Sequence, residues 1–255
     1  MQHSYTQSLT VVIPVLNEEM AIETVIENIK TEGYEHILVV DGYSTDKTVQ
    51  IAEKMGVHVI YQAGEGKTGA IETAIMTIET PYMVFLDGDC TYDPKDIINI
   101  ANQFDEADLV IGVRANGREN IPLFNRFGNW FINFEFNTLV GASLVDVCSG
   151  MYGLRTEFAK TLIFETSGFD VEVEIAAQAV KYGVVAQVPI NYYDRVGQQK
   201  LQPVKHGLKI IFTVLKMGMR NIIYGSLLRT VPPEFEKRLV FSGSNQRTHA
   251  RAHSD

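Results

Sequence analysis

Val84-Phe85-Leu86-Asp87-Gly88-Asp89-Cys90-Thr91-Tyr92-Asp93-Pro94 is an apolar run that stops at two aspartates one residue apart. The run 82–86 is typical of a buried strand, so both aspartates would emerge at its carboxyl end, where Gly88 lets the backbone turn. In an open α/β sheet that edge binds ligands. Two carboxylates so close repel one another unless a cation lies between them, and Mg²⁺ takes one or two carboxylates plus phosphate oxygens. The stretch therefore indicates either a metal site or a solvated Asp-Gly turn.

Strand and helix patterns alternate before this stretch. Apolar, β-branched runs predict strands over 9–15, 36–40 and 57–61. Helical spacing predicts a helix over 21–29, one capped by Ser44 or Thr45 that ends near Met55, and one over 70–78. Such alternation with short connections predicts a mostly parallel sheet. If the first strand lies between the second and the fourth, Asp41 and the aspartate pair flank a crevice of nucleotide size.

The second half of the chain alternates less regularly. We expect a helix over 95–104, a strand over 108–113 that presents Arg114 at its end, a helix opened by 168–174 and a strand over 184–190. Turn residues surround Ser149-Gly150. Within 124–136, aromatic residues share one helical face: Phe127, Trp130, Phe131 and Phe134. Such a stripe is typical of core packing.

Length and composition limit the classes of protein. The 255 residues are 45% hydrophobic and 21% charged, as expected for one folded domain with or without an appendage. The two cysteines, Cys90 and Cys148, have no metal-ligand spacing and indicate a reducing compartment. Residues 1–8 lack the apolar core of a signal peptide, so a cytoplasmic location is expected. A net charge of -9 argues against nucleic acid as a partner.

The charge is unevenly distributed along the chain. Residues 195–230 contain seven Lys or Arg and no acid. At about 100° per residue, four of these cations share a narrow helical arc: Lys205, Lys209, Lys216 and Arg220. No apolar run approaches the roughly 18 residues of a membrane-spanning helix. We expect a domain over 1–203, a basic amphipathic segment over 204–230 on an anionic membrane surface, and a disordered tail over 242–255. The alternative for 204–230 is a final helix packed on the domain with a solvated basic edge.

Gly64-Glu-Gly-Lys-Thr-Gly69 matches the dinucleotide-binding pattern G-x-G-x-x-G, which would make the chain a nicotinamide-dependent oxidoreductase. That fingerprint belongs on the first strand of the sheet, however, and here the first strand has no glycine after it. A phosphate-binding P-loop would need glycine at Tyr61. We favour a third interpretation, in which the loop lets the backbone and Lys67 approach a nucleotide.

Four short motifs, in order, resemble those of the GT-A glycosyltransferases of family 2. They are Ile13-Pro-Val-Leu-Asn-Glu18, Val40-Asp-Gly-Tyr-Ser-Thr-Asp46, Gly66-Lys-Thr-Gly-Ala70 and Asp87-Gly-Asp89. The second half is similar to polyprenyl-phosphate sugar synthases of the dolichyl-phosphate-mannose-synthase type. The similar segments are Gly112-Val-Arg114, Arg126, Asp146-Val-Cys-Ser-Gly150 and 188–201. Further details, such as Gly168-Phe-Asp-Val-Glu-Val-Glu174, resemble archaeal members that load the first N-glycan sugar onto dolichyl phosphate.

The resemblance, which covers roughly residues 9–225, implies an α/β fold of the GT-A type: a Rossmann-like, mostly parallel sheet flanked by helices, with amphipathic helices at the C-terminus. It implies transfer of a sugar from a nucleotide sugar, UDP-glucose or UDP-N-acetylglucosamine, to dolichyl or polyprenyl phosphate, as an early step of protein N-glycosylation. Such an enzyme would be peripheral on the cytoplasmic face of the cell membrane.

Residue roles follow from the same resemblance. The nucleotide sugar would be bound by Pro14, Asn17, Glu18, Asp41, Lys67, Asp87, Gly88 and Asp89. Asp87 and Asp89 would also hold Mg²⁺ or Mn²⁺. Arg114 and Arg126 would clamp the acceptor phosphate. The catalytic set would be Asp89, Arg114, Arg126, Arg195 and Lys200. Asp146 and Asp170 are available as a general base, although each suits a turn or a helix cap equally well.

The sequence departs from the family's patterns at three positions. Gly42 replaces a second aspartate, Thr91 stands where mannose synthases often have glutamine, and Gln199 replaces a serine before Lys200. The last two departures leave the donor sugar and the outer ligands of the metal open. The alternatives are a glycosyltransferase with a soluble acceptor, a GDP-mannose-dependent dolichyl-phosphate mannose synthase, a nucleotide-binding module without activity and, more remotely, the nicotinamide-dependent oxidoreductase.

Overall fold

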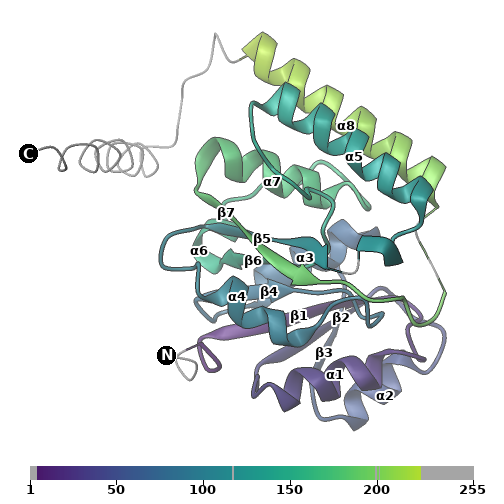
Figure 1. The fold of residues 1–255 in the computed structure, drawn as a ribbon. Helices are drawn as coiled ribbons and strands as arrows, with labels where there is room; N and C mark the ends of the chain where they lie inside the picture. Colours follow the sequence, from purple (N-terminus) through teal and green to yellow (C-terminus); the bar gives the residue numbers. More distant parts are fainter. Residues whose placement is uncertain (1–4, 117, 199, 201, 225–255) are drawn as a thin grey trace, which may run out of the picture.

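A seven-stranded sheet forms the centre of the computed structural model, which describes residues 5–116, 118–198, 200 and 202–224 (Figure 1). The strands are β1 (Leu9–Val15), β2 (Ile37–Asp41), β3 (His58–Tyr61), β4 (Tyr82–Phe85), β5 (Leu109–Asn116), β6 (Tyr152–Arg155) and β7 (Val185–Asn191). Their order is β3-β2-β1-β4-β6-β5-β7, and only β6 is antiparallel to its neighbours. The predicted α/β class is confirmed.

Helices cover both faces of the sheet and make two apolar cores. One face carries α1 (Ile22–Thr31), α2 (Thr48–Lys54) and α4 (Ile97–Ala101). The other carries α3 (Gly66–Thr77), α5 (Leu123–Val140), α6 (Thr156–Ala159), α7 (Val171–Tyr182) and α8 (Pro203–Tyr224). Short 3-10 turns occupy Pro94–Asp96 (η2) and Arg118–Asn120 (η3). Because both faces are covered, the central strands are continuous apolar runs rather than alternating ones.

The expected position of the first strand is confirmed: β1 lies between β2 and β4, with Val15 opposite Asp41 and Val12 opposite Phe85. All three strands are parallel, so their carboxyl ends meet at one edge of the sheet. Asp41 and the Asp87–Asp89 pair therefore share the edge where the strand order reverses.

Three local predictions were wrong. The strand β6 was missed, because its four residues follow a turn and contain Gly153. The helix α3 begins at Gly66 rather than Ala70, so most of the glycine-rich segment is its first turn. The helix α2 begins at Thr48, and Asp46 rather than Ser44 or Thr45 accepts a hydrogen bond from the Thr48 amide at 2.9 Å.

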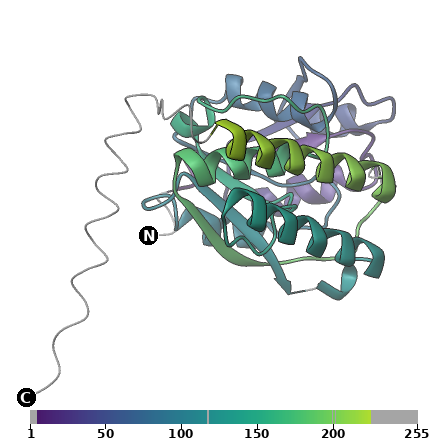
Figure 2. The same cartoon turned by 90° about the horizontal axis from the view of Figure 1, so that it is seen from above.

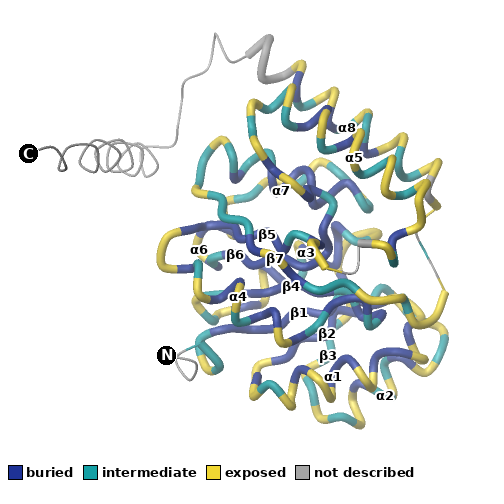
Figure 3. Tube along the Cα trace, in the orientation of Figure 1, coloured by how far each residue is buried: buried dark blue, intermediate teal, exposed yellow. Residues whose placement is uncertain are grey.

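The expectation that the aromatic stripe of α5 is core was also wrong. The side chains of Phe127, Trp130, Phe131 and Phe134 are exposed, whereas Ile132 and Phe136 reach the core. Figure 3 shows that α5 has both exposed and buried positions along its length. Helical spacing predicts which side chains share a face, but not which face the rest of the fold covers.

The helix predicted within 205–220 is part of α8, which lies beside α5 in both views (Figures 1 and 2). Its residues Ile210 and Val214 are buried in the same core as Ile132 and Phe136 of α5. In the described part of the chain, no helix has the length and apolar character needed to cross a bilayer. Gln199 and the tail 242–255 lie outside the described residues.

Candidate active site

Backbone strain marks the edge where β1, β2 and β4 end. Outside glycine, the described residues with positive φ are Asn17 (52°), Tyr43 (64°) and Cys90 (65°), and each follows one of these strands. A left-handed backbone is unfavourable for such residues and persists only where the surroundings hold it. Hydrogen bonds between two of the loops hold Asn17 in this way: its amide donates to Ser44 Oγ at 2.8 Å, and its Oδ1 accepts from the Thr45 amide at 2.7 Å.

The two aspartates after β4 lie at this edge and are each paired with a cation. Asp87 Oδ1 is 2.7 Å from Lys67 Nζ, and Asp89 Oδ2 is 2.7 Å from Arg195 Nη1. A Cβ at Gly88 would lie 2.8 Å from Val15 Cγ1, so only glycine lets this segment pass so close to β1. Asp89 is buried, while Asp87 is partly open to solvent.

Thr91 orients Asp89. Its amide and its hydroxyl donate to Asp89 Oδ1 at 3.1 and 2.5 Å. The side chain at the position where relatives often have glutamine therefore holds the aspartate rather than pointing away from it. Burial, and then the charge of Asp87, raise the pKa of Asp89 despite these bonds.

Glu172 completes the surroundings of Lys67, and the sequence reasoning did not single it out. Its Oε1 is 2.7 Å from Lys67 Nζ, and both side chains are largely buried. Burial alone would lower the pKa of Lys67, but Asp87 and Glu172 raise it well above its usual value. The signal for Glu172 was available in the acidic start of α7, although spacing alone could not tell it from Glu174, which accepts hydrogen bonds from residues 165 and 166.

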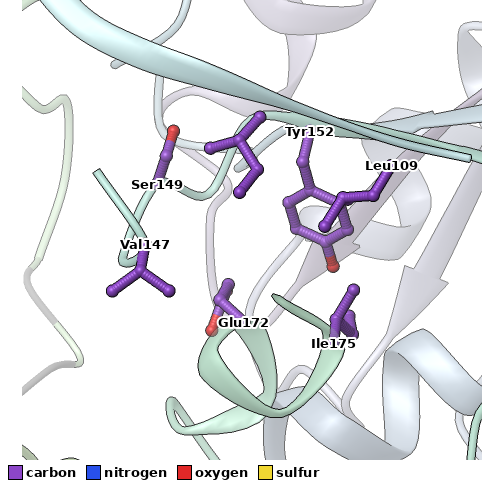
Figure 4. A pocket seen from close by; sticks show the side chains of 7 residues that line it. Leu109, Val147, Ser149, Tyr152, Glu172 and Ile175 are labelled. Atoms are coloured by element: carbon purple, nitrogen blue, oxygen red, sulfur yellow. The ribbon is translucent and has the colours of Figure 1, made fainter. Parts of the chain in front are cut away.

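A small cavity of about 10 Å³ lies behind Glu172, lined also by Ser149 and Tyr152 (Figure 4). It has room for about one water molecule and none for a substrate. Lys67 and Asp87 do not line this cavity, so the cavity is separate from the point where these two side chains meet.

Arg195 and Lys200, which follow β7, bring two cations to this edge of the sheet. Arg195 bonds both Asp89 and Glu18 Oε1, and Lys200 Nζ lies 2.9 Å from the same Glu18 oxygen. Lys200 also donates to the Asn17 carbonyl at 2.6 Å. Burial raises the pKa of Glu18, and Lys200 and Arg195 oppose that rise.

The edge also has polar atoms without partners. Among the described residues, five buried side-chain atoms have no hydrogen bond, and three of them are Glu18 Oε2, Asp41 Oδ1 and Arg195 Nε. The other Asp41 oxygen accepts from the Ser44 amide at 2.8 Å. Because an unpaired buried polar atom is costly, their clustering here is typical of a site that a ligand completes.

Arg114 is buried and already paired. Its Nε and Nη2 each lie 2.6 Å from an oxygen of Asp146, and its guanidinium lies 5.3 Å above the ring of Tyr192. Asp146 is thus the bidentate partner of Arg114 rather than an isolated base. Asp170 is not a side-chain cap for α7, because its carboxylate accepts from Lys209 at 3.1 Å and Thr213 at 2.9 Å on α8.

The predicted site residues other than Arg114 therefore fall into three groups. The first group is held by salt bridges in two clusters. One cluster contains Glu18, Asp89, Arg195 and Lys200. The other joins Lys67 to Asp87 and to Glu172. Pro14, Asn17, Asp41 and Gly88 lie on or beside the ends of β1, β2 and β4. Arg126 stands apart: it is exposed on α5 and, within the described part of the chain, makes no salt bridge.

A cationic cavity of about 270 Å³ opens beside Lys67. It lies between the start of α3, the turn before α7 and the start of α8. Its charged and titratable lining residues are Lys67, Asp170, Lys205, His206 and Lys209. Because Lys67 and Lys209 are already paired with carboxylates, Lys205 is the lining cation that would meet an anionic ligand.

The donor set at the aspartate pair suits a divalent cation only in part. No set of three His, Cys, Asp or Glu side chains able to hold a metal exists in the described residues. Two carboxylates match Mg²⁺ or Mn²⁺ when substrate phosphates supply further oxygens. The pair therefore fits a metal that arrives with a diphosphate.

Comparison with known proteins agrees with this geometry. Residues 10–163 match the family model described as glycosyl transferase family 2. The chain is 35% identical over 221 residues to glycosyltransferase AglJ of Haloferax volcanii, covering 84% of this chain and 73% of that protein. It is 36% identical over 223 residues to a dolichyl-phosphate hexose transferase of the same organism, covering 84% and 95% of the two chains.

Solved structures agree on the fold. Glucosyl-3-phosphoglycerate synthase of Mycobacterium tuberculosis, in complex with Mn²⁺, UDP-glucose and phosphoglyceric acid, superposes with a TM-score of 0.68 at 22% identity. The match covers 83% of this chain and 80% of that one. The seven-stranded sheet thus has the GT-A fold, and this chain belongs to glycosyl transferase family 2.

Proposed function

We propose that this glycosyltransferase moves a hexose from a nucleotide sugar, UDP-glucose or UDP-N-acetylglucosamine, to dolichyl or another polyprenyl phosphate. This would be an early step of protein N-glycosylation, carried out at the cytoplasmic face of the cell membrane. The observation that supports it most is the 36% identity over 95% of the length of a protein named dolichyl-phosphate hexose transferase.

The edge of the sheet suits the donor. Asp41 has a buried oxygen with no hydrogen-bond partner in the described part of the chain, beside the backbone turn after β2, where a nucleoside could donate to it. Asp87 and Asp89 lie beyond it, across the end of β1. Arg195 and Lys200 bring two cations to the same edge, where they would neutralise the departing diphosphate.

Asp87 and Asp89 would hold Mg²⁺ or Mn²⁺ together with the diphosphate oxygens. When bound, the metal would act as a Lewis acid on the diphosphate. Lys67 would balance the charge of Asp87, and Thr91 would keep Asp89 in place. The related synthase of Mycobacterium tuberculosis has been solved with Mn²⁺ or Mg²⁺ and UDP.

A phosphate acceptor would need no general base. Such a group is already ionised at neutral pH, so an oxygen of it can attack the sugar without giving up a proton. Asp146 and Asp170 are engaged by Arg114 and Lys209, which favours structural roles for both. We propose that Arg126, exposed on α5, attracts the acceptor phosphate and that the cationic cavity receives it. Arg114 could join them only by giving up part of its bond to Asp146.

A soluble phosphorylated acceptor is the second candidate, because the structurally similar synthase was solved with phosphoglyceric acid. GDP-mannose is the alternative donor, since nothing in the unpaired Asp41 oxygen selects one base. Both alternatives are tested by one matrix of assays: labelled UDP-glucose, UDP-N-acetylglucosamine and GDP-mannose, each with dolichyl phosphate or phosphoglyceric acid. Label in the organic phase supports the proposal, and label only in phosphoglyceric acid contradicts it.

A further inference from the structure

Two adjacent helices expose an unusual amount of apolar surface. On α5 the exposed side chains are Leu123, Phe124, Phe127, Trp130, Phe131 and Phe134. On α8 they are Val204, Leu208, Phe212, Leu215 and Met219. Their exposed fractions run from 38% for Leu215 to 78% for Leu123. We call these eleven side chains the α5–α8 apolar face.

The two stripes form one surface. Residues Ile132 and Phe136 of α5, and Ile210 and Val214 of α8, are buried in a common core, so the opposite sides of both helices turn outward. A Cβ at Gly218 would lie 2.7 Å from Leu139 Cβ, so the helices touch closely at that point. Figures 1 and 2 both show them side by side, and Figure 3 shows exposed positions along each.

The area is large for a surface left in water. Half-exposed aromatic and aliphatic side chains of this number present on the order of 1,000 Å², against a few hundred Å² for the largest patch of an ordinary monomer. Rings also gather there: Trp130 lies 5.8 Å from Phe127 and 6.0 Å from Phe134, between ring centroids. An exposed apolar surface of this size is typical of a site that binds another molecule or a membrane.

The charged residues of α5 and α8 indicate what binds to this face. Glu135 is the single acid in the two helices, and it is buried. Exposed cations lie along both outer margins: Arg126 on α5, and Lys205, Lys209 and Lys216 on α8. Lys209 and Lys216 are held on the side of the domain by Asp170 and Glu165. An apolar face with cationic margins matches the acyl and headgroup layers of an anionic bilayer.

The position of the cationic cavity agrees with a bilayer. Lys205 and Lys209 belong both to the margin of the apolar face and to the lining of the cavity that reaches Lys67. Val204 and Leu208 of the face alternate with them along α8. A phosphate at headgroup depth would therefore meet the cavity without its lipid tail leaving the acyl layer.

We infer that the α5–α8 apolar face inserts into the surface of an anionic membrane and is the main anchor of the protein. The inference extends the proposed function, because it explains how a lipid-bound phosphate reaches the aspartate pair. It also changes the expectation from the sequence: the apolar stripes, rather than the basic arc, supply most of the binding, and the cations add to it.

Trp130 is the single tryptophan of the chain and lies within the face, so the full-length protein carries its own probe. Its emission is measured with vesicles of phosphatidylcholine, with and without phosphatidylglycerol, at low and at high salt. We expect a blue shift and quenching by brominated acyl chains. High salt should weaken but not abolish binding to the anionic vesicles.

The variant Phe127→Ser/Phe212→Ser removes one ring from each helix and keeps Trp130. It should lower partitioning by about a hundredfold, because each lost ring forfeits apolar burial in the bilayer. Its melting temperature should match that of the wild type, since both rings are exposed. Met76→Ser/Ile163→Ser is the matched control: both side chains are at least as exposed but lie elsewhere, and vesicle binding should persist.

Three results would overturn the inference. These are Trp130 emission that vesicles leave unchanged, loss of all binding at high salt, and a blue shift that depends on protein concentration without lipid, as for a second copy covering the face. Sugar transfer is assayed separately on detergent-dispersed acceptor. Insertion without transfer would refute the proposed function alone, and transfer without insertion would refute this inference alone.

Discussion

Arg195 joins two carboxylates that follow different strands: Nη1 lies 2.7 Å from Asp89 Oδ2, and Nη2 contacts Glu18 Oε1. Asp89 follows β4 and Glu18 follows β1, so one guanidinium from the loop after β7 ties the edge of the sheet together. Its Nε remains buried without a partner among the described residues. A diphosphate oxygen would meet both that nitrogen and the charge.

Arg195→Ala should lower kcat by about a hundred- to a thousandfold, as loss of a positioned donor to a developing negative charge does. The two carboxylates left unpaired would also weaken donor binding. Arg195→Lys should restore part of the rate because it keeps the charge and loses the planar fork. Steady-state kinetics check this, with Lys54→Ala on α2 as a surface control. A normal kcat for Arg195→Ala would remove this residue from the reaction.

Lys67→Met should destabilise the fold by about 3–5 kcal/mol at neutral pH, because it leaves the carboxylate of Glu172 buried beside Asp87 without its cation. Burial already raises the pKa of Glu172, and loss of Lys67 would raise it further. Between pH 4.5, the ordinary pKa, and the raised pKa, Glu172 is therefore protonated in the folded variant but ionised in the unfolded chain.

The variant therefore loses stability as pH rises from 4.5 through the raised pKa of Glu172, and regains it as pH falls. Urea unfolding at pH 5 and pH 7 should show the larger difference from wild type at pH 7. In the double variant Lys67→Met/Glu172→Gln, the pH dependence of unfolding free energy that we attribute to Glu172 should disappear. An equal loss at both pH values would mean that Glu172 is not the group responsible.

Alanine variants of Arg114 and Arg126 should differ in their effects on unfolding free energy and on acceptor binding. Arg114→Ala leaves Asp146 buried and unpaired, so we expect a loss of about 3–5 kcal/mol in unfolding free energy. Arg126→Ala removes an exposed side chain and should change stability by less than about 0.5 kcal/mol. Arg126→Ala should nevertheless raise KM for polyprenyl phosphate and leave KM for the donor unchanged. If acceptor KM stays normal, Arg126 has no place in the acceptor site.

We expect sugar transfer to depend on a divalent metal ion. Asp89→Ala should abolish transfer, and EDTA should do the same to the wild type. Mn²⁺ with UDP should raise the melting temperature of the wild type, since a ligand at a hundred times its Kd adds about 2.7 kcal/mol. The raised pKa of Asp89 means that its proton leaves at higher pH than usual, so the thermal shift should shrink as pH is lowered toward 5. Asp105→Ala, in an exposed position after α4, is the control; a full shift in Asp89→Ala would contradict the assignment.

Sequence patterns predicted the first half of this fold well because its strands are buried on both faces and its helices have one buried stripe. The parallel runs from β1 to β5 and the position of Asp41 beside the aspartate pair follow from such local patterns. The Lys67–Glu172 and Arg114–Asp146 pairs could not be predicted, because they join segments that only the folded chain brings together. The exposure of Trp130 was missed for the same reason: periodicity does not show what covers a face.

The reaction proposed for this protein is transfer of sugar from a nucleotide sugar to a polyprenyl phosphate. To measure it, the full-length protein is incubated with labelled nucleotide sugar, Mg²⁺ or Mn²⁺ and dolichyl phosphate, and label is followed into the organic phase. We predict label there from UDP-glucose or UDP-N-acetylglucosamine, and none with Asp89→Ala or without dolichyl phosphate. An organic phase that stays unlabelled with every donor, while the same protein labels a water-soluble acceptor, would contradict the account.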